Sequence, residues 1–229
     1  MAMCTVFATA GAAFAQTAPW PEPQNVLQLS ASGTVEVQQD LLSMSLTTTR
    51  EGTEASGVQA QLKTALDAAL AEAKRSAQPG QLDVRTGSFS LSPRYTREGK
   101  INGWQGSAEL ILEGRDFPRI TQTAGRITTL TVGGVGFGLS REQRAKVEAD
   151  AQTLAIDNFK QKADSLAKGF GFGSYTLREV SVNASQDGPI RPRMMAMQAS
   201  AKSMSDSAVP VEAGKTNVVV NVSGSVQLK

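Results

Sequence analysis

The residue types that could perform chemistry in this chain are few. Its 229 residues include no histidine and a single cysteine, Cys4. Without histidine there is no Ser-His-Asp triad, no imidazole general base and no histidine-ligated zinc site. Carboxylates, serine–lysine pairs, tyrosines and methionines remain, so an enzyme of this sequence would depend mainly on carboxylates, alone or with a bound metal.

One serine–lysine pair has the spacing of a known nucleophile. Ser165 and Lys168 form S-x-x-K, the acylating motif of penicillin-recognising enzymes. The pair lies in the last turn of a predicted helix rather than the first, and the accompanying S-D-N and K-T-G motifs are missing from the sequence. We therefore expect Ser165 and Lys168 to be solvated surface residues.

Acidic residues gather along the same predicted helix without a catalytic spacing. Lysines and arginines lie beside them, which is typical of a solvated face with local ion pairs. Which acids face each other is not encoded in the spacing, so no glycosidase-type pair is identified. The acids are Glu142, Glu148, Asp150, Asp157 and Asp164.

Four methionines form the one unusual cluster: Met194, Met195, Met197 and Met204. Thioethers can bind Cu(I) or act as oxidation targets. Methionines also attach loops to a protein surface or to another subunit. The repeated M-x-x-M ladders of copper carriers are missing, so we favour the structural role and keep copper binding as the alternative.

A glycine-rich segment, 133–139, directly precedes a predicted helix start, where a phosphate-binding loop would lie. Its spacing does not match the dinucleotide fingerprint, and it has no P-loop lysine. Glycines that alternate with Val135, Phe137 and Leu139 instead predict a strand that faces a close neighbour.

The longest predicted element is a helix over 140–171. Ser140 and Gln143 match a capping box, and Gly169 or Gly171 supplies the stop. Apolar residues at three- and four-residue steps predict one buried stripe. Its members are Ala145, Ala149, Ile156, Phe159, Ala163, Leu166 and Phe170.

Alternating apolar residues predict strands on either side of this helix. Residues 27–49 predict a hairpin that turns at Gln38, Gln39 and Asp40, and Asp116 predicts the cap of a short helix. The other predicted elements are a helix over 53–76 and strands at 84–95, 104–112, 175–184 and 218–228. Strand–helix–strand thus occurs twice, which predicts an α+β fold with a mixed or antiparallel sheet, two main helices and one short helix packed on it.

The first residues have the character of an export signal. Residues 1–15 are small and apolar and end in Ala13-Phe14-Ala15, an A-x-A cleavage site. The prolines that follow would interrupt a buried N-terminal helix, the competing interpretation. Cleavage after Ala15 would remove Cys4, and a chain without thiols suits an oxidising compartment. We therefore predict a signal peptide at 1–15, a proline-rich lead-in at 16–25, and one domain at 26–229 with an irregular loop at about 185–214.

The strand LSASGTVEV at 29–37 opens an ordered set of short motifs. The others follow at 66–70, 84–95, 103–107, 135–140, 162–167 and 209–214. In this order the motifs resemble those of the SIMPL-domain proteins of bacterial envelopes, whose opening motif is similar to the strand at 29–37. The resemblance implies a periplasmic α+β protein without an established enzymatic activity. Members are described as oxidative-stress defence proteins or immunogenic antigens, and some form hollow rings.

Together these observations predict a periplasmic, non-enzymatic protein that works as a homo-oligomeric or binding scaffold, associated with the envelope and needing no cofactor. The net charge of +2 and the lack of a basic stripe exclude a typical nucleic-acid binder. The alternatives are a carboxylate- or metal-dependent envelope enzyme, a copper-binding protein, and capture of an extended peptide along a sheet edge.

Overall fold

The computed structural model describes residues 24–184 and 211–229. Several predicted features lie outside these residues. They are the signal peptide at 1–15, almost all of the lead-in at 16–25, most of the loop at 185–214, and Met194, Met195, Met197 and Met204. Within the described part, no helix has the length and apolar character that crossing a membrane requires.

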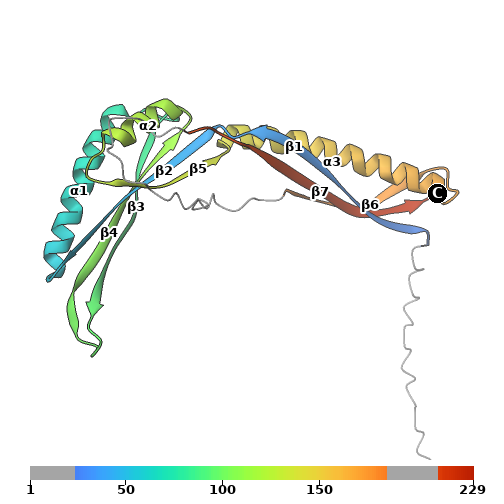
Figure 1. Cartoon of the computed structure of the whole chain (residues 1–229). Coiled ribbons are helices and arrows are strands. Elements are labelled where there is room, and N and C mark those ends of the chain that lie inside the picture. Colours follow the sequence, from blue (N-terminus) through green and yellow to red (C-terminus); the bar gives the residue numbers. More distant parts are fainter. Residues whose placement is uncertain (1–23, 185–210) are drawn as a thin grey trace, which may run out of the picture.

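The predicted α+β fold is confirmed. The strands form two separate antiparallel sheets, one of four strands and one of three. Figure 1 shows the two sheets end to end in an elongated, bent molecule, with helices on one face of each. Each sheet and its helices enclose a separate cluster of buried apolar residues.

The four-stranded sheet is covered by two helices. Its strand order is β3-β4-β2-β5, and the faces that bury Leu46, Leu110 and Leu112 pack against Leu62 and Ile120. Asp116 caps the short helix as predicted, accepting from the Arg119 N–H at 3.0 Å. The elements are β2 (Leu41–Gly52), α1 (Ala55–Ser76), β3 (Asp83–Tyr95), β4 (Ile101–Gly114), α2 (Phe117–Arg126) and β5 (Thr131–Gly138).

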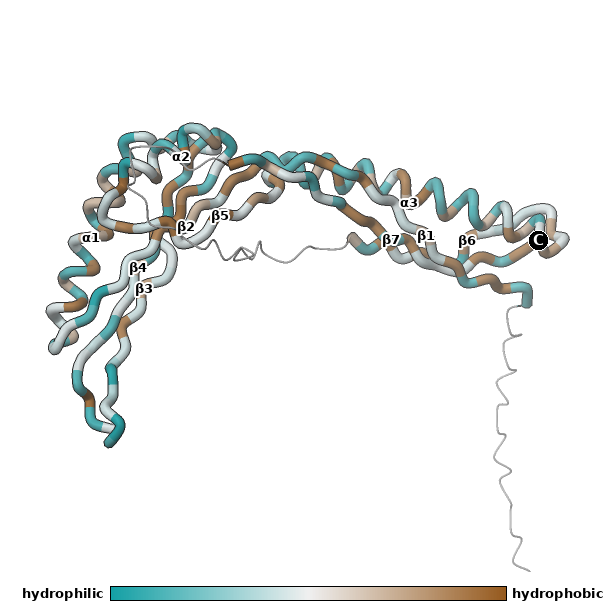
Figure 2. The backbone as a smooth tube through the Cα atoms, viewed as in Figure 1, coloured by the Kyte–Doolittle hydropathy of each residue, from teal (hydrophilic) through white to brown (hydrophobic). Residues whose placement is uncertain are grey.

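The three-stranded sheet is covered by one long helix. Its strand order is β1-β7-β6, and its buried residues alternate along β7, as the sequence predicts. Figure 2 shows this apolar character along β7 and a mostly hydrophilic outer side of the helix. The elements are β1 (Val26–Gln38), α3 (Arg141–Gly169), β6 (Tyr175–Ala184) and β7 (Lys215–Leu228).

The predicted hairpin over 27–49 is wrong. β1 pairs with β7 along its whole length, whereas β2 pairs with β4 and β5 in the other sheet. Gln39 and Asp40 therefore carry the chain from one sheet into the other instead of reversing it. The alternation of apolar residues identifies a strand but does not identify its partner, which here lies near the other end of the chain.

The start of α3 is confirmed, but the predicted stripe lies partly on the wrong face. Ser140 Oγ accepts from the Gln143 N–H at 3.2 Å. Ala145 and Ala149 are exposed, and Phe170 exposes 63% of its surface. The buried residues recur at strict four-residue intervals: Val147, Ala151, Ala155, Phe159, Ala163 and Ala167. Because alanines occur on both faces of the helix, composition alone does not distinguish the buried one.

The helix lies close against β1 at Gly33. A Cβ atom at Gly33 would lie 2.2 Å from the Ala151 carbonyl oxygen and 2.5 Å from the Ala155 nitrogen. Only glycine permits this approach, since both neighbouring atoms belong to the helix backbone. α3 and β1 are also matched in length, at about 43 Å each for 29 and 13 residues.

Hydrogen bonds join the chain segments that pass between the sheets. The Asp40 carboxylate accepts from the Ser140 N–H at 2.7 Å and from the Ser140 hydroxyl at 2.6 Å. Gln39 donates from its side chain to the Phe137 carbonyl and from its backbone to the Gly214 carbonyl. Ser140 is buried and Asp40 is half-buried, so these bonds connect the two halves at a partly shielded position.

Candidate functional site

The residues with possible nucleophile spacing lie at the surface. Ser165 and Lys168 are both exposed on α3, as the sequence predicts. The glycine-rich segment forms β5, which pairs with β2. The turn before α3, where an anion would bind at a helix N-terminus, is occupied by the carboxylate of Asp40.

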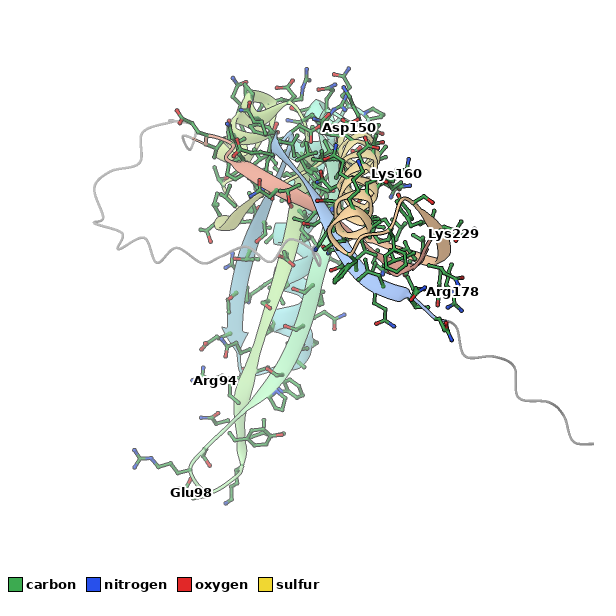
Figure 3. All side chains as sticks on the ribbon, turned by 90° about the vertical axis from the view of Figure 1, so that its right-hand side faces the viewer. Arg94, Glu98, Asp150, Lys160, Arg178 and Lys229 are labelled. Atoms are coloured by element: carbon green, nitrogen blue, oxygen red, sulfur yellow. The ribbon has the colours of Figure 1, made fainter. Side chains whose placement is uncertain are left out.

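The predicted acids on α3 are dispersed. Glu142 lies 3.7 Å from Arg115, and Glu148 lies 3.9 Å from Arg144. The remaining acids, Asp150, Asp157 and Asp164, are exposed. In the side-on view of Figure 3, Asp150 and Lys160 on α3 lie far from Arg94 and Glu98 on the β3–β4 hairpin. Residues 24–184 and 211–229 contain no group of three acidic side chains placed to hold a metal ion.

A cleft of about 710 Å³ lies where the two sheets meet. Both arginines and acids line its walls, and its Arg115 and Glu142 pair with each other. A wall of mixed charge does not concentrate the potential of one sign that would attract an ionic ligand. The charged lining residues are Asp83, Glu113, Arg115, Arg141, Glu142 and Arg144.

β6 presents exposed apolar side chains at the edge of the three-stranded sheet. We define the β6 surface as Leu177, Val180, Val182 and Ala184. The first three expose 55%, 43% and 43% of their surfaces. Leu177 and Val182 pair with Val226 and Val222, whose buried side chains face α3. Val180 pairs with Gly224 in the same alternation, so all three side chains point to the helix side of the sheet. Because α3 lies mainly over β1 and β7, no helix in the described part of the chain covers these apolar side chains.

A groove of about 320 Å³ runs between this surface and α3. One wall carries Ala145 and Ala149, which the sequence assigns to the core stripe, and the floor carries Val182 and Ala184. The groove therefore explains the second apolar row on α3: these alanines face a shallow depression beside β6 instead of the sheet core. The sequence contains this row of alanines but gives no sign of which row is buried.

The two edges of the three-stranded sheet differ in their protection. Along β1, the Asn158 side chain donates to the Ser32 carbonyl and the Lys162 ammonium donates to the Ser30 carbonyl, both at 2.9 Å. These bonds block the outer edge of β1. Among the described residues, no corresponding side chain donates to the backbone of β6. No sequence pattern described above singles out Asn158 and Lys162, although their i,i+4 spacing places both on one face of α3.

Tyr175 begins β6, and we expect its hydroxyl to lose its proton at a higher pH than that of an ordinary tyrosine. Burial, and secondarily the negative charge of Asp164, raise the pKa of Tyr175 above its ordinary value of 10.0. The stabilising contribution of neutral Tyr175 is therefore fully present below its unfolded-state pKa and is lost as the pH rises through the folded-state pKa. In the Tyr95→Phe variant, Tyr175 is the sole tyrosine. Its tyrosinate absorbance should have a higher midpoint in the folded protein than in urea, and equal midpoints would contradict this prediction.

The chain matches a known family model over most of its length. The SIMPL model, described as "Protein of unknown function (DUF541)", matches residues 27–226. No curated protein matches the chain. The matched residues include both sheets and all three helices. This protein therefore belongs to the SIMPL family.

Proposed function

We propose that this protein is an exported, non-enzymatic protein of the bacterial envelope that works by association through the β6 surface. The observation that carries the proposal is an apolar strand, β6, at an edge of the three-stranded sheet that no helix or side chain among the described residues covers. Exposed apolar side chains next to unpaired backbone groups favour binding to another polypeptide. Tolerance of oxidative or envelope stress is the physiological role that we propose for the assembled protein.

Export and a binding role have separate support. The apolar segment at 1–15 and the A-x-A site support export and a periplasmic location. The dispersed acids and the mixed-charge cleft of the described residues offer no concentrated catalytic group. Fractionation of cells that express the tagged full chain tests export. Recovery of the uncleaved chain from the cytosol would contradict it.

Association is tested by changing the β6 surface. Val182→Lys places a charge among apolar side chains and at the strand edge, so we expect the assembled protein to dissociate to monomers. Multi-angle light scattering at several concentrations measures the change. Val132→Lys on β5 is the matched control, since Val132 exposes 42% of its surface and Val182 exposes 43%. A wild-type protein that remains monomeric at high concentration would refute the proposal.

The stress role is tested in cells. A strain that lacks the gene should lose viability in peroxide or envelope-damaging agents, and the wild-type gene should restore it. If assembly is needed, Val182→Lys should fail to restore viability whereas Val132→Lys should succeed. Full rescue by a Val182→Lys protein shown to be monomeric would separate the stress role from association.

A further inference from the structure

We infer that two copies of this chain join through β6 in an antiparallel pair centred on Val182, forming one continuous six-stranded sheet. This inference rests on the proposed function, because it names the partner and the geometry of the β6 surface. It is carried by three features of the structure: the direction of the backbone groups in β6, the position of a bulge, and the blocked edge of β1.

The blocked edge of β1 fixes the direction of the backbone groups. Asn158 and Lys162 reach the carbonyls of Ser32 and Ser30, so these carbonyls point away from β7. In antiparallel sheets both polar groups of a residue point to the same side, and the side alternates along the strand. Val222 therefore points its backbone groups toward β1, and its neighbour Ser223 points toward β6.

The same alternation continues into β6. Ser181 and Asn183 lie opposite Ser223 and Asn221, so their backbone groups bond to β7. The N–H and C=O groups of Val180, Val182 and Ala184 must then point outward, along the free edge. These three residues belong to the β6 surface, so here the outward-pointing backbone groups and the exposed apolar side chains belong to the same residues.

A bulge limits the part of the edge that another strand can use. The register of β6 against β7 shifts between Leu177 and Glu179, which leaves Arg178 as the extra residue. Gly224 accommodates the bulge, because a Cβ there would lie 2.2 Å from the Glu179 carbonyl oxygen. The regular edge therefore begins at Val180, and the charged residues Arg178 and Glu179 lie outside it.

The regular edge is complementary to a second copy of itself. With Val182 opposite Val182 of the second copy, Val180 lies opposite Ala184 and Ser181 lies opposite Asn183. All three outward-pointing residues then form hydrogen-bonded pairs with outward-pointing residues. Apolar residues oppose apolar residues on the helix side, a hydroxyl opposes an amide on the other side, and no like charges meet.

The helices leave room for this pairing. Both copies of α3 would lie on the same face of the joined sheet, each over β1 and β7. Their axes would then be about four strand spacings, or about 19 Å, apart, beyond the 8–10 Å of packed helices. The outer edges of the six-stranded sheet would both be β1, which Asn158 and Lys162 block. The sheet therefore ends after two copies and does not continue as a fibre.

Disulfide trapping in the full chain tests this arrangement. In a Cys4→Ser background the wild-type residues supply no other cysteine. Val182→Cys should form an intermolecular disulfide under mild oxidation, since opposed Cα atoms in such a pair are about 5.5 Å apart, within disulfide range. Leu177→Cys is the matched control, because Leu177 is more exposed, at 55%, but lies about 34 Å from its copy in this register. We expect Val182→Cys to cross-link at least about tenfold faster, since paired residues have a high effective concentration.

The outcomes separate the inference from the proposed function. Equal cross-linking of the two variants, or mass spectrometry showing Val182→Cys joined to a different protein, would overturn the inference. If light scattering shows an assembled wild-type protein but Val182→Cys does not cross-link, association stands and the β6 pairing is refuted. A wild-type protein that is monomeric at all concentrations would refute both.

Discussion

The Gly33→Ala variant is expected to unfold with a free energy about 3 kcal/mol lower than that of the wild-type protein. The added Cβ would lie 2.2 Å from the Ala151 oxygen and 2.5 Å from the Ala155 nitrogen. Both atoms belong to the backbone of α3, so no side-chain rotation relieves the overlap and the helix must move away from β1. Urea denaturation followed by circular dichroism measures the loss.

Gly57→Ala is the matched control for this prediction. Gly57 lies in α1, and a Cβ there would meet no atom within 4 Å. Alanine also favours a helix more than glycine does, so the free energy of unfolding should rise, by about 0.5 kcal/mol. If Gly33→Ala proves as stable as the wild-type protein, α3 does not lie against β1 as closely as the structure shows.

Asp40→Ala should lower the free energy of unfolding by about 3 kcal/mol and weaken the connection between the two halves of the molecule. The substitution removes two charge-assisted hydrogen bonds to Ser140 and leaves the buried Ser140 N–H and hydroxyl without this acceptor. Since each sheet has its own apolar core, the halves should then unfold less cooperatively. In a Trp20→Phe background, Trp104 fluorescence reports on the four-stranded half and circular dichroism reports on both, so the two unfolding curves should separate.

Asp116→Ala provides the comparison for Asp40→Ala. Asp116 also accepts from a backbone N–H at a helix start, but it caps α2 within the four-stranded half, and its hydrogen bonds to Arg119 do not join the halves. Asp116→Ala should lower the free energy of unfolding by about 1 kcal/mol and leave the two unfolding curves coincident. Coincident curves for Asp40→Ala would show that the halves remain coupled without the Asp40–Ser140 bonds.

Local structure could be predicted from the sequence because it depends on near neighbours. The Ser140 cap, the Asp116 cap and the alternation along β7 all involve residues a few positions apart. The glycine-rich segment at 133–139 is predicted as a strand because its spacing excludes a phosphate loop and its apolar residues alternate, and residues 133–138 lie in β5.

Long-range structure could not be predicted in the same way. β1 finds its partner almost 200 residues away, and no local pattern distinguishes that pairing from a hairpin with β2. On α3, alanine is found both in the core at Ala151 and in the groove at Ala145, and it is too small for its placement to reveal the buried face. The β6 surface was missed for a related reason, since its alternation predicts burial that the offset position of α3 does not provide.

The four-residue spacing of the buried stripe makes the contact surface of α3 wind around the helix axis as it follows the sheet. Successive members of the stripe advance by about 40° around the axis, so the line of contact turns through about 200° from Val147 to Ala167. Sliding the helix along the sheet without rotating it would move alanines out of contact and charged residues in. An inserted residue in the middle of α3 would rotate all following residues of the helix by about 100° around its axis. A shift of the helix along its axis would not return the buried stripe to the sheet. The length of α3 is therefore fixed as firmly as its composition.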